Sequence, residues 1–228
     1  VIAEHLMTKQ DWAATVSQVQ QDLRVALARV RKRPQPEPLA IRRFVFSEMD
    51  RDGQPELQQQ GGLLPDGHVF PATTMEAQTG GERINMLTAI RRTLDVELTC
   101  NPKVVVFGED VGPKGGVHAA TLGLQDKHGK GRVFDTSLSE EGIIGRAVGM
   151  AVAGLMPVPE IQFRKYADPA EEQLNDCGTM RWRTANRFAA PMVVRIPGGF
   201  FKAGDPWHSQ SNEVKWLHAI GWQLAMPS

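Results

Sequence analysis

The chain has 228 residues, of which 41% are hydrophobic, and its 26 Lys and Arg residues balance 26 Asp and Glu residues. This length suits one substantial core with an appendage, and the balanced charge provides no strong field to attract nucleic acid or an anionic membrane surface. No stretch of about 18 apolar residues occurs and the first residues lack an export signal, so we expect a protein that neither spans a membrane nor is exported.

The first predicted element is an amphipathic helix that begins near Asp11, whose carboxylate suits the N-cap position. Six apolar side chains recur at spacings of three and four on one stripe: Trp12, Val16, Val19, Leu23, Leu27 and Val30. The basic run at residues 31–33 suits the negative end of this helix, and Pro34 prevents its continuation. Such an exposed apolar stripe is a candidate for burial against a partner.

Residues 34–82 form a predicted linker between a helical segment, residues 1–33, and a domain of residues 83–228. The linker is rich in Pro, Gln, Gly and charged residues, and glycine pairs interrupt any regular pattern. We therefore place the domain boundary near Gly81. The patch Phe44-Val45-Phe46 is the exception in this polar stretch, and we expect it to lie against a neighbour.

After Gly81, helical stretches alternate with short apolar stretches, which is typical of a parallel sheet. The first helix ends at Asn101-Pro102, and strands are expected at residues 104–107, 133–134, 158–163, 192–196 and 222–226. The pattern predicts an α/β fold in which helices cover both faces of a parallel sheet. Ligands gather at the carboxyl ends of parallel strands, so the chemistry is expected in the loops that begin at Gly108, Asp135, Gln162 and Pro197.

The cysteines and the chain ends also allow expectations. Cys100 and Cys177 are far apart and have no second Cys or His at metal-ligand spacing, so we expect reduced thiols in a cytoplasmic-type compartment. The sequence begins at Val1 without an initiator Met and stops at Ser228 directly after the last expected strand. We therefore expect a piece of a longer protein.

Two local motifs are ordinary when taken alone. The loop Gly108-Glu109-Asp110-Val111-Gly112 leaves a strand as a phosphate-binding loop would, but it lacks both the GxGxxG order and a Gly-Lys-Ser/Thr. A simple turn is the better interpretation. Asp168, before Pro169 and two glutamates, is similarly predicted to be a structural N-cap.

Glu140 and His208 are likewise weak candidates individually. Glu140 lies where a helix is expected to begin, and acidic residues are common in a first helical turn. His208 lies in a loop, where histidines are often simply exposed. Neither residue predicts a site without its neighbours.

The order of five blocks changes this assessment. The chain contains, in order, Val106-Phe107-Gly108-Glu109-Asp110-Val111, Leu138-Ser139-Glu140-Glu141-Gly142-Ile143-Ile144-Gly145, Glu160-Ile161-Gln162-Phe163, Val194-Arg195-Ile196-Pro197 and His208-Ser209-Gln210-Ser211. Together these blocks resemble the β subunit of 2-oxo acid dehydrogenase E1 components over about residues 84 to 228. The resemblance implies a transketolase-like module that binds the pyrimidine of thiamine diphosphate.

The resemblance also implies roles for individual residues. Glu140 would contact N1′ of the aminopyrimidine and promote the imino tautomer of its 4′-amino group, provided that an apolar pocket raises the pKa of this carboxyl. Leu138 and Gln162 would line the same pocket. Tyr166 would pack on the cofactor, and His208 would face the reacting carbon.

The resemblance also implies a cation site, and the chain departs from the family pattern at one place. Backbone carbonyls near Ala190, Met192 and Val193 would bind a structural potassium ion. The chain departs from the common pattern at Arg164-Lys165, where small and acidic residues are usual. These two charges put the placement of Tyr166 and the substrate selectivity in question.

The implied reaction is oxidative decarboxylation of a 2-oxo acid, pyruvate or a branched-chain acid, with transfer of the acyl group to a lipoyl-bearing E2 partner. The family's Gly-Asp-Gly with a downstream Asn-Asn, which holds magnesium and diphosphate, is absent from the 228 residues. An E1 α part is therefore expected, in an α2β2-type assembly, with the Trp12 stripe and the Phe44 patch as candidate contacts.

Several alternatives remain open. Residues 1–80 resemble, loosely, the C-terminal helix of an E1 α component with a linker, which suggests a fused α–β chain; a family-specific N-terminal extension is the second interpretation. A transketolase or deoxyxylulose phosphate synthase would share the sheet and the glutamate, but the His208 block argues against it. A non-catalytic nucleotide-binding or scaffolding module is disfavoured because GxGxxG is absent.

Overall fold

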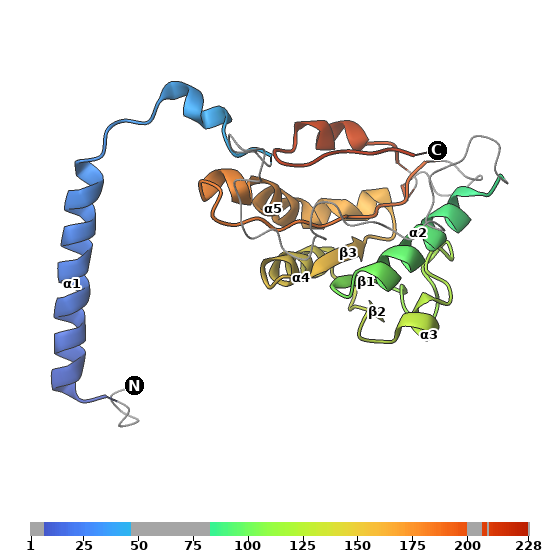
Figure 1. Ribbon diagram of the computed structural model, residues 1–228, viewed down its shortest axis with the longest axis horizontal. Helices are drawn as coiled ribbons and strands as arrows, with labels where there is room; N and C mark the ends of the chain where they lie inside the picture. Colours follow the sequence, from blue (N-terminus) through green and yellow to red (C-terminus); the bar gives the residue numbers. More distant parts are fainter. Residues whose placement is uncertain (1–6, 47–82, 200–206, 209, 228) are drawn as a thin grey trace. The chain divides into compact units, whose positions relative to one another are not determined.

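The computed structural model describes residues 7–46, 83–199, 207–208 and 210–227 (Figure 1). The chain divides into two compact units, Val1–Arg42 and Arg43–Ser228. The predicted boundary near Gly81 lies outside the described residues, so the division into residues 1–33, 34–82 and 83–228 stays a prediction.

The first unit contains the predicted amphipathic helix, α1 (Lys9–Arg31), followed by a short 3-10 helix, η1 (Pro38–Arg42). The N-cap is Thr8 rather than Asp11. Asp11 occupies the third helical position of a capping box, in which its N–H donates to Thr8 Oγ1 over 3.1 Å and its carboxylate accepts from Thr8 N–H over 3.2 Å. Hydrogen bonds from Thr8 lower the pKa of Asp11.

The apolar stripe of α1 is exposed along its length, and none of the residues of this helix is buried. Trp12 is 49% exposed and Leu23 is 64% exposed. Among the described residues, no helix combines the length and the apolar character that a membrane crossing requires.

The second unit is built on a parallel sheet, as the sequence predicts, but in the described residues this sheet has three strands where five were expected. Strands β1 (Val104–Gly108), β2 (Val133–Asp135) and β3 (Met156–Glu160) follow the order β2-β1-β3. Gly108 at the end of β1 pairs with Asp135 of β2 and with Glu160 of β3. All three strands therefore end at one edge of the sheet.

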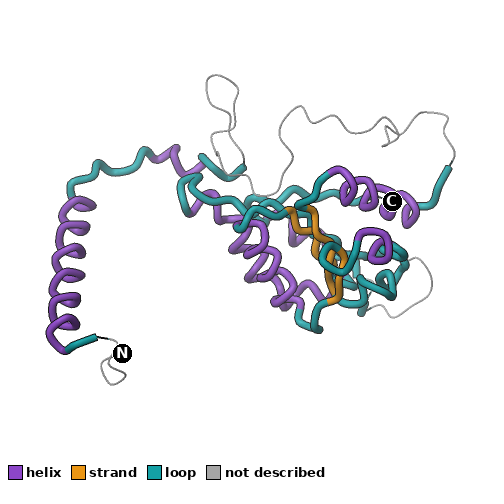
Figure 2. The backbone as a smooth tube through the Cα atoms, turned by 60° about the horizontal axis from the view of Figure 1, so that its bottom comes forward, coloured by secondary structure: helices purple, strands orange, loops and turns teal. Residues whose placement is uncertain are grey.

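Helices cover both faces of this sheet, which confirms the predicted architecture (Figure 2). Val104 and Val106 of β1 pack with α2 (Met86–Cys100) and α3 (Leu124–His128) on one face. On the other face, alternate side chains of β1, Val105 and Phe107, pack with α4 (Glu140–Val152). Strand side chains alternate between faces, so the continuous apolar run of β1 is what a strand buried on both sides requires.

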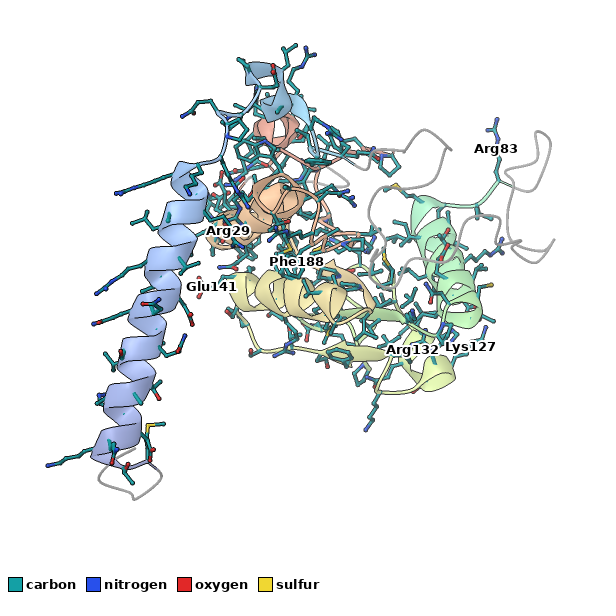
Figure 3. All side chains as sticks on the ribbon, turned by 60° about the vertical axis from the view of Figure 1, so that its left-hand side comes forward. Arg29, Arg83, Lys127, Arg132, Glu141 and Phe188 are labelled. Atoms are coloured by element: carbon teal, nitrogen blue, oxygen red, sulfur yellow. The ribbon has the colours of Figure 1, made fainter. Side chains whose placement is uncertain are left out.

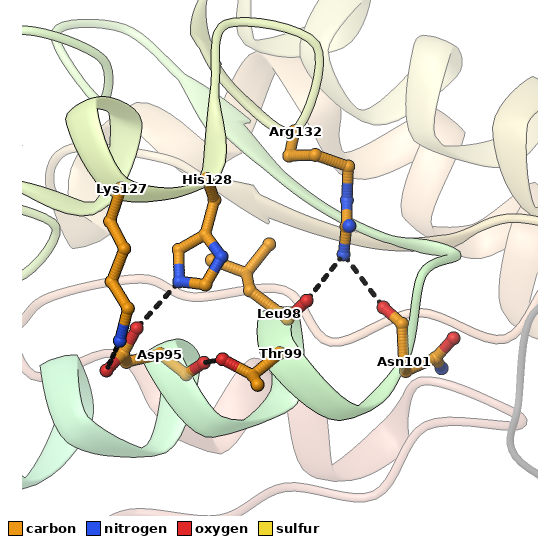
Figure 4. A network of polar contacts seen from close by, with 7 residues as sticks. All are labelled: Asp95, Leu98, Thr99, Asn101, Lys127, His128 and Arg132. Atoms are coloured by element: carbon orange, nitrogen blue, oxygen red, sulfur yellow. Dashed lines mark hydrogen bonds and ion pairs between the residues drawn. The ribbon is translucent and has the colours of Figure 1, made fainter.

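Arg132 fixes the turn that enters the sheet. Its guanidinium donates to the carbonyls of Leu98 and Asn101 at the end of α2 (Figure 4). It also donates to the carbonyl of Val104, the first residue of β1. Figure 3 shows Arg132 and Lys127 on the side of the unit that carries α2. This partly buried arginine satisfies three carbonyls and so ties the end of α2 and the start of β1 to the residue that precedes β2.

The predicted strand at Met192–Ile196 is only partly formed. Val193 and Arg195 donate their N–H groups to the carbonyls of Pro157 and Pro159 in β3, and Ile161 donates to Arg195 O. The structure assigns this segment one isolated parallel bridge, between Glu160 and Arg195, and no strand. Pro157 and Pro159 have no N–H to donate in return, so the return hydrogen bond on this edge of β3 comes from Ile161 instead.

The predicted strand at Trp222–Met226 is wrong. The segment follows the 3-10 helix η3 (Glu213–His218) and packs on α5 (Glu171–Arg183), where Trp222 Nε1 donates to Leu174 O over 2.8 Å. The backbone of Gly221 approaches Gly178 of α5 so closely that a Cβ at either position would overlap the other segment. Docking on a helix leaves this segment away from the sheet.

Asp168 is not the N-cap of α5 either. That position is held by Ala170, at the end of the 3-10 helix η2 (Arg164–Ala170), and it makes no side-chain cap. Asp168 instead accepts hydrogen bonds from Lys165 and Lys215, each over 2.5 Å. Burial would raise the pKa of Asp168, but these two ammonium groups outweigh burial and lower it.

Candidate functional site

The candidate site lies at the edge where β1, β2 and β3 end. Gly108 is required there because a Cβ at this position would overlap Glu160 O on the neighbouring strand. Asp135, at the end of β2, accepts a 2.6 Å hydrogen bond from Gly112 N–H in the loop after β1. Ligand-binding loops in parallel α/β sheets occupy this edge.

Glu140 is the first residue of α4 and is partly buried. The helix is capped by Ser139, whose Oγ accepts from Gly142 N–H over 3.2 Å. Burial, then the charges of Asp110 and Glu140, raise the pKa of Glu109. The loop after β1 therefore brings a second carboxyl into the field of Glu140.

Leu138 does not enclose Glu140 within this chain, because its side chain is 74% exposed. A carboxyl at a helix N-terminus that is open on one side stays accessible to a ligand and to a second protein surface. Among the described residues, Leu138 therefore offers an open apolar surface near Glu140 and not the wall of a closed pocket.

Gln162 connects the loop after β3 to the loop after β1. Its amide Nε2 lies 3.3 Å from both Glu109 O and Asp110 Oδ2, to which it donates. Asp110 also forms a 2.6 Å ion pair with Lys114. The loop that the sequence suggested was a simple turn thus holds Gln162 in the site.

Four rings form an aromatic cluster beside these polar groups: His118, Phe163, Tyr166 and His208. The ring of Phe163 makes edge-to-face contacts with all three others, at centroid distances of 5.9 Å to His118, 5.7 Å to Tyr166 and 4.9 Å to His208. Tyr166 Oη and His208 Nε2 are hydrogen-bonded over 2.6 Å. The cluster brings together residues from three loops.

Arg164 and Lys165 do not disturb Tyr166. Arg164 forms a 2.7 Å ion pair with Glu213. Lys165 pairs with Asp168 and lies 4.6 Å from the ring centroid of Trp207. Both charges that depart from the family pattern are neutralised within the chain, which leaves Tyr166 to contact His208.

This geometry agrees with comparisons to known proteins. Residues 82–228, more than half of the chain, match the family described as the transketolase pyrimidine-binding domain. The chain belongs to this family.

Within the family, the pyrimidine-binding domain of this chain is similar to several curated subunits. It is 47% identical over 146 residues to the 2-oxoisovalerate dehydrogenase subunit beta of Pseudomonas aeruginosa. The aligned region covers 64% of this chain and 42% of that relative. It is 43% identical over 150 residues to the 3-methyl-2-oxobutanoate dehydrogenase subunit beta of Mycobacterium tuberculosis, covering 64% and 42%. The pyruvate dehydrogenase E1 component subunit beta of Acholeplasma laidlawii is 42% identical over 147 residues, covering 64% and 45%. The chain spans less than half the length of these relatives.

The residues of the pyrimidine-binding domain fit one end of thiamine diphosphate. Glu140 offers a carboxyl for a ring nitrogen, and the exposed Leu138 and the ring of Phe163 offer apolar surface for an aromatic heterocycle. For the magnesium end, the described part of the chain contains no group of three or more His, Cys, Asp or Glu side chains that could hold a metal ion.

The positions expected to bind potassium have mixed surroundings. Ala190 is buried and its carbonyl accepts from the Cys177 thiol over 3.4 Å, whereas Val193 is 52% exposed. Met192 packs against the clusters beneath α4. Burial raises the pKa of Cys177 to about 12, so this thiol stays protonated and keeps its donor. A potassium site here remains a prediction.

Sequence reasoning overlooked His118, Phe163 and Glu109 as members of the site. Phe163 stood inside one of the five blocks, next to Gln162, and its ring type was the available signal. Glu109 was attributed to a turn. No sequence pattern indicated His118, because only the fold of the loop after β1 brings it to Phe163.

Proposed function

We propose that this chain supplies the pyrimidine-binding half of the active site in the E1 component of a 2-oxo acid dehydrogenase complex. The proposed reaction is thiamine-dependent oxidative decarboxylation of a 2-oxo acid, followed by transfer of the acyl group to lipoamide. One observation carries the proposal. Gln162 bonds to Glu109, whose pKa is raised by burial and by nearby charges that include Glu140, and Phe163, the neighbour of Gln162, contacts both Tyr166 and His208. These residues lie in a domain that is 47% identical over 146 residues to a 2-oxoisovalerate dehydrogenase subunit beta.

The role proposed for Glu140 is to hold a proton at N1′ of the pyrimidine. Thiamine diphosphate, when bound, supplies the nucleophilic carbon and the electron sink for decarboxylation. Glu140 stands at a helix N-terminus beside Glu109, whose pKa is raised, and a covering α part would desolvate both carboxyls. Desolvation favours the protonated carboxyl that N1′ requires. Leu138 and Gln162 would line the pocket around it.

His208 is proposed to face the reacting carbon and to move or orient a proton during transfer to lipoamide. Its bond to Tyr166 and its contact with Phe163 fix the imidazole in one orientation. A positioned imidazole is worth more as a proton donor than a mobile one, because proton transfer depends on distance and alignment. Tyr166, proposed to pack on the cofactor, thereby also orients His208.

The proposed partners follow from what the pyrimidine-binding domain does not provide. An E1 α part would hold magnesium and diphosphate, in an α2β2-type assembly, and a lipoyl-bearing E2 would accept the acyl group. The exposed stripe of α1 and the patch at residues 44–46 are the surfaces proposed to meet the α part. Whether residues 1–80 come from a fused α part or form a family-specific extension stays open.

The location and the structural cation are also proposed. We propose a cytoplasmic location, or the mitochondrial matrix in a eukaryote. The name of the relative from Dictyostelium discoideum includes "mitochondrial", which supports the second location. Potassium would bind carbonyls near Ala190, Met192 and Val193.

The experiment that tests this function is an assay of the complete α-containing protein with two classes of substrate. With 2-oxoisovalerate or pyruvate, lipoyl-bearing E2 and thiamine diphosphate, we expect acyl transfer to lipoamide. Transfer of a two-carbon unit to a sugar phosphate, without oxidation of a 2-oxo acid, would instead indicate a transketolase or a deoxyxylulose phosphate synthase. No thiamine-dependent reaction at all would favour a non-catalytic subunit.

A further inference from the structure

His118 is a second histidine in the aromatic cluster, and the proposed function does not use it. Its ring contacts Phe163 edge-to-face, with an interplanar angle of 81°. His208 contacts the same ring at an angle of 76°. Two imidazoles from separate loops therefore contact one phenyl ring of the site.

The loop that carries His118 is held at both ends. Gly116 N–H donates to Asp110 O over 2.6 Å, and the buried hydroxyl of Thr121 donates to Val111 O over 2.8 Å. The side chain of His118 is exposed, and Phe163 is its only recorded partner among the residues that the structure describes. Its ring nitrogens are therefore available to hydrogen-bond a ligand.

The other donors around this region already have partners. Lys114 pairs with Asp110, and Arg164 pairs with Glu213. Arg195 pairs with Glu160, whose side chain is almost fully buried. His208 has one nitrogen bonded to Tyr166. Of these groups, His118 is the one that forms no hydrogen bond or ion pair with the described residues, so its ring is free to turn an N–H toward an incoming anion.

We propose that His118 donates a hydrogen bond to the carboxylate of the 2-oxo acid and thereby orients the substrate for loss of carbon dioxide, an inference that rests on the proposed function. The carboxylate must leave as a neutral molecule, so strong binding of its charge would stabilise the ground state more than the transition state. An imidazole N–H orients the group with less stabilisation than a bidentate guanidinium would give. His118 is thus a binding residue of the substrate.

The test uses the complete α-containing complex and an artificial electron acceptor, with 2-oxoisovalerate compared with 2-methylpropanal. The aldehyde adds at the same cofactor carbon and loses a proton where the 2-oxo acid loses carbon dioxide, so it has no carboxylate to bind. His118→Phe keeps a ring for Phe163 but loses the N–H. We expect the KM for 2-oxoisovalerate to rise roughly tenfold to a hundredfold, as for a lost hydrogen bond to a charged group, with a far smaller change for the aldehyde.

Two further variants and one binding measurement complete the test. His118→Gln restores an N–H donor, so the KM for 2-oxoisovalerate should fall part of the way back to the wild-type value. His218 is an exposed histidine outside the cluster, and His218→Phe should leave the KM unchanged for both substrates. In a Glu140→Gln background, which blocks turnover, calorimetry should show weaker binding of 2-oxoisovalerate when His118→Phe is added. Equal changes for both substrates, or none, would overturn the inference while a normal wild-type reaction keeps the proposed function. A wild-type complex without 2-oxo acid activity would overturn both.

Discussion

Tyr166 Oη lies 2.6 Å from Nε2 of His208, although 42 residues separate them in the sequence. The phenol anchors an imidazole from a different loop, and Phe163 contacts both rings. The site is therefore assembled by tertiary contacts at the carboxyl edge of the sheet.

If His208 serves acyl transfer, His208→Ala should impair the E2-coupled reaction far more than the reaction with an artificial electron acceptor. Decarboxylation depends mainly on the electron sink of the cofactor, whereas opening the dithiolane requires a proton for a leaving sulfur. Both rates should be measured on one preparation, with Tyr166→Phe as a variant that removes only the hydrogen bond. Parallel losses in the two assays, together with a lower melting temperature, would return His208 to a structural role.

Glu140→Gln in the complete complex should preserve folding and weaken cofactor binding moderately, while turnover falls more than about a hundredfold, as for a positioned acid–base group. The amide cannot share a proton with N1′ as a carboxyl does. Glu141, the next residue of α4, is exposed, so Glu141→Gln is the matched control and should leave turnover unchanged. Near-normal turnover of Glu140→Gln would remove this residue from the mechanism.

The Glu160–Arg195 pair should stabilise the edge of the sheet beneath the site. Arg195 NH2 lies 2.7 Å from Glu160 Oε2, and the Glu160 side chain is 3% exposed. Arg195→Met leaves that carboxylate buried without its cation, which typically costs about 3 kcal/mol or more. Denaturant unfolding should show this loss, and Glu160→Met combined with Arg195→Met should cost less than the sum of the single changes. Additive losses would contradict coupling between the two groups.

Asp95 should make the stability of the α2–α3 contact depend on pH. Burial would raise the pKa of its carboxyl, but Lys127 and His128, each 2.6 Å away, outweigh burial and hold it below the ordinary value of 3.8 (Figure 4). A lowered carboxyl pKa contributes stability above pH 3.8 that is lost as the pH falls through the folded-state value. Asp95→Asn should therefore have a lower melting temperature than wild type near neutrality, and the two curves should converge in acid. A difference that stays constant into acid would rule out this linkage.

The sequence predicted most of the core because β1 and α2 carry unambiguous apolar patterns. It was wrong at residues 222–226, where Gly221 lets the chain pack on α5, a contact that no local pattern specifies. It was partly right at residues 192–196, where the prolines of β3 remove the donors that a full ladder needs.

The sequence likewise indicated some residues of the site and missed others. The resemblance that rests on the ordered blocks indicated Glu140, Gln162, Tyr166 and His208, whose roles stay predictions. The sequence did not indicate the ion-pair partners of Arg164 and Lys165 or the contact of His118 with Phe163. These contacts depend on loops that meet only in the folded chain. Such long-range contacts leave no periodic signal in a sequence.

The most direct test of the split site is calorimetric titration of magnesium thiamine diphosphate into two samples, the complete α-containing complex and this chain alone. Because the chain offers residues for the pyrimidine and its described part has no cluster for magnesium, we expect clear binding by the complex and no more than weak binding by the chain at any magnesium concentration. Micromolar binding by the isolated chain, or no binding by the complete complex, would contradict the claim that this domain provides one half of a shared cofactor site.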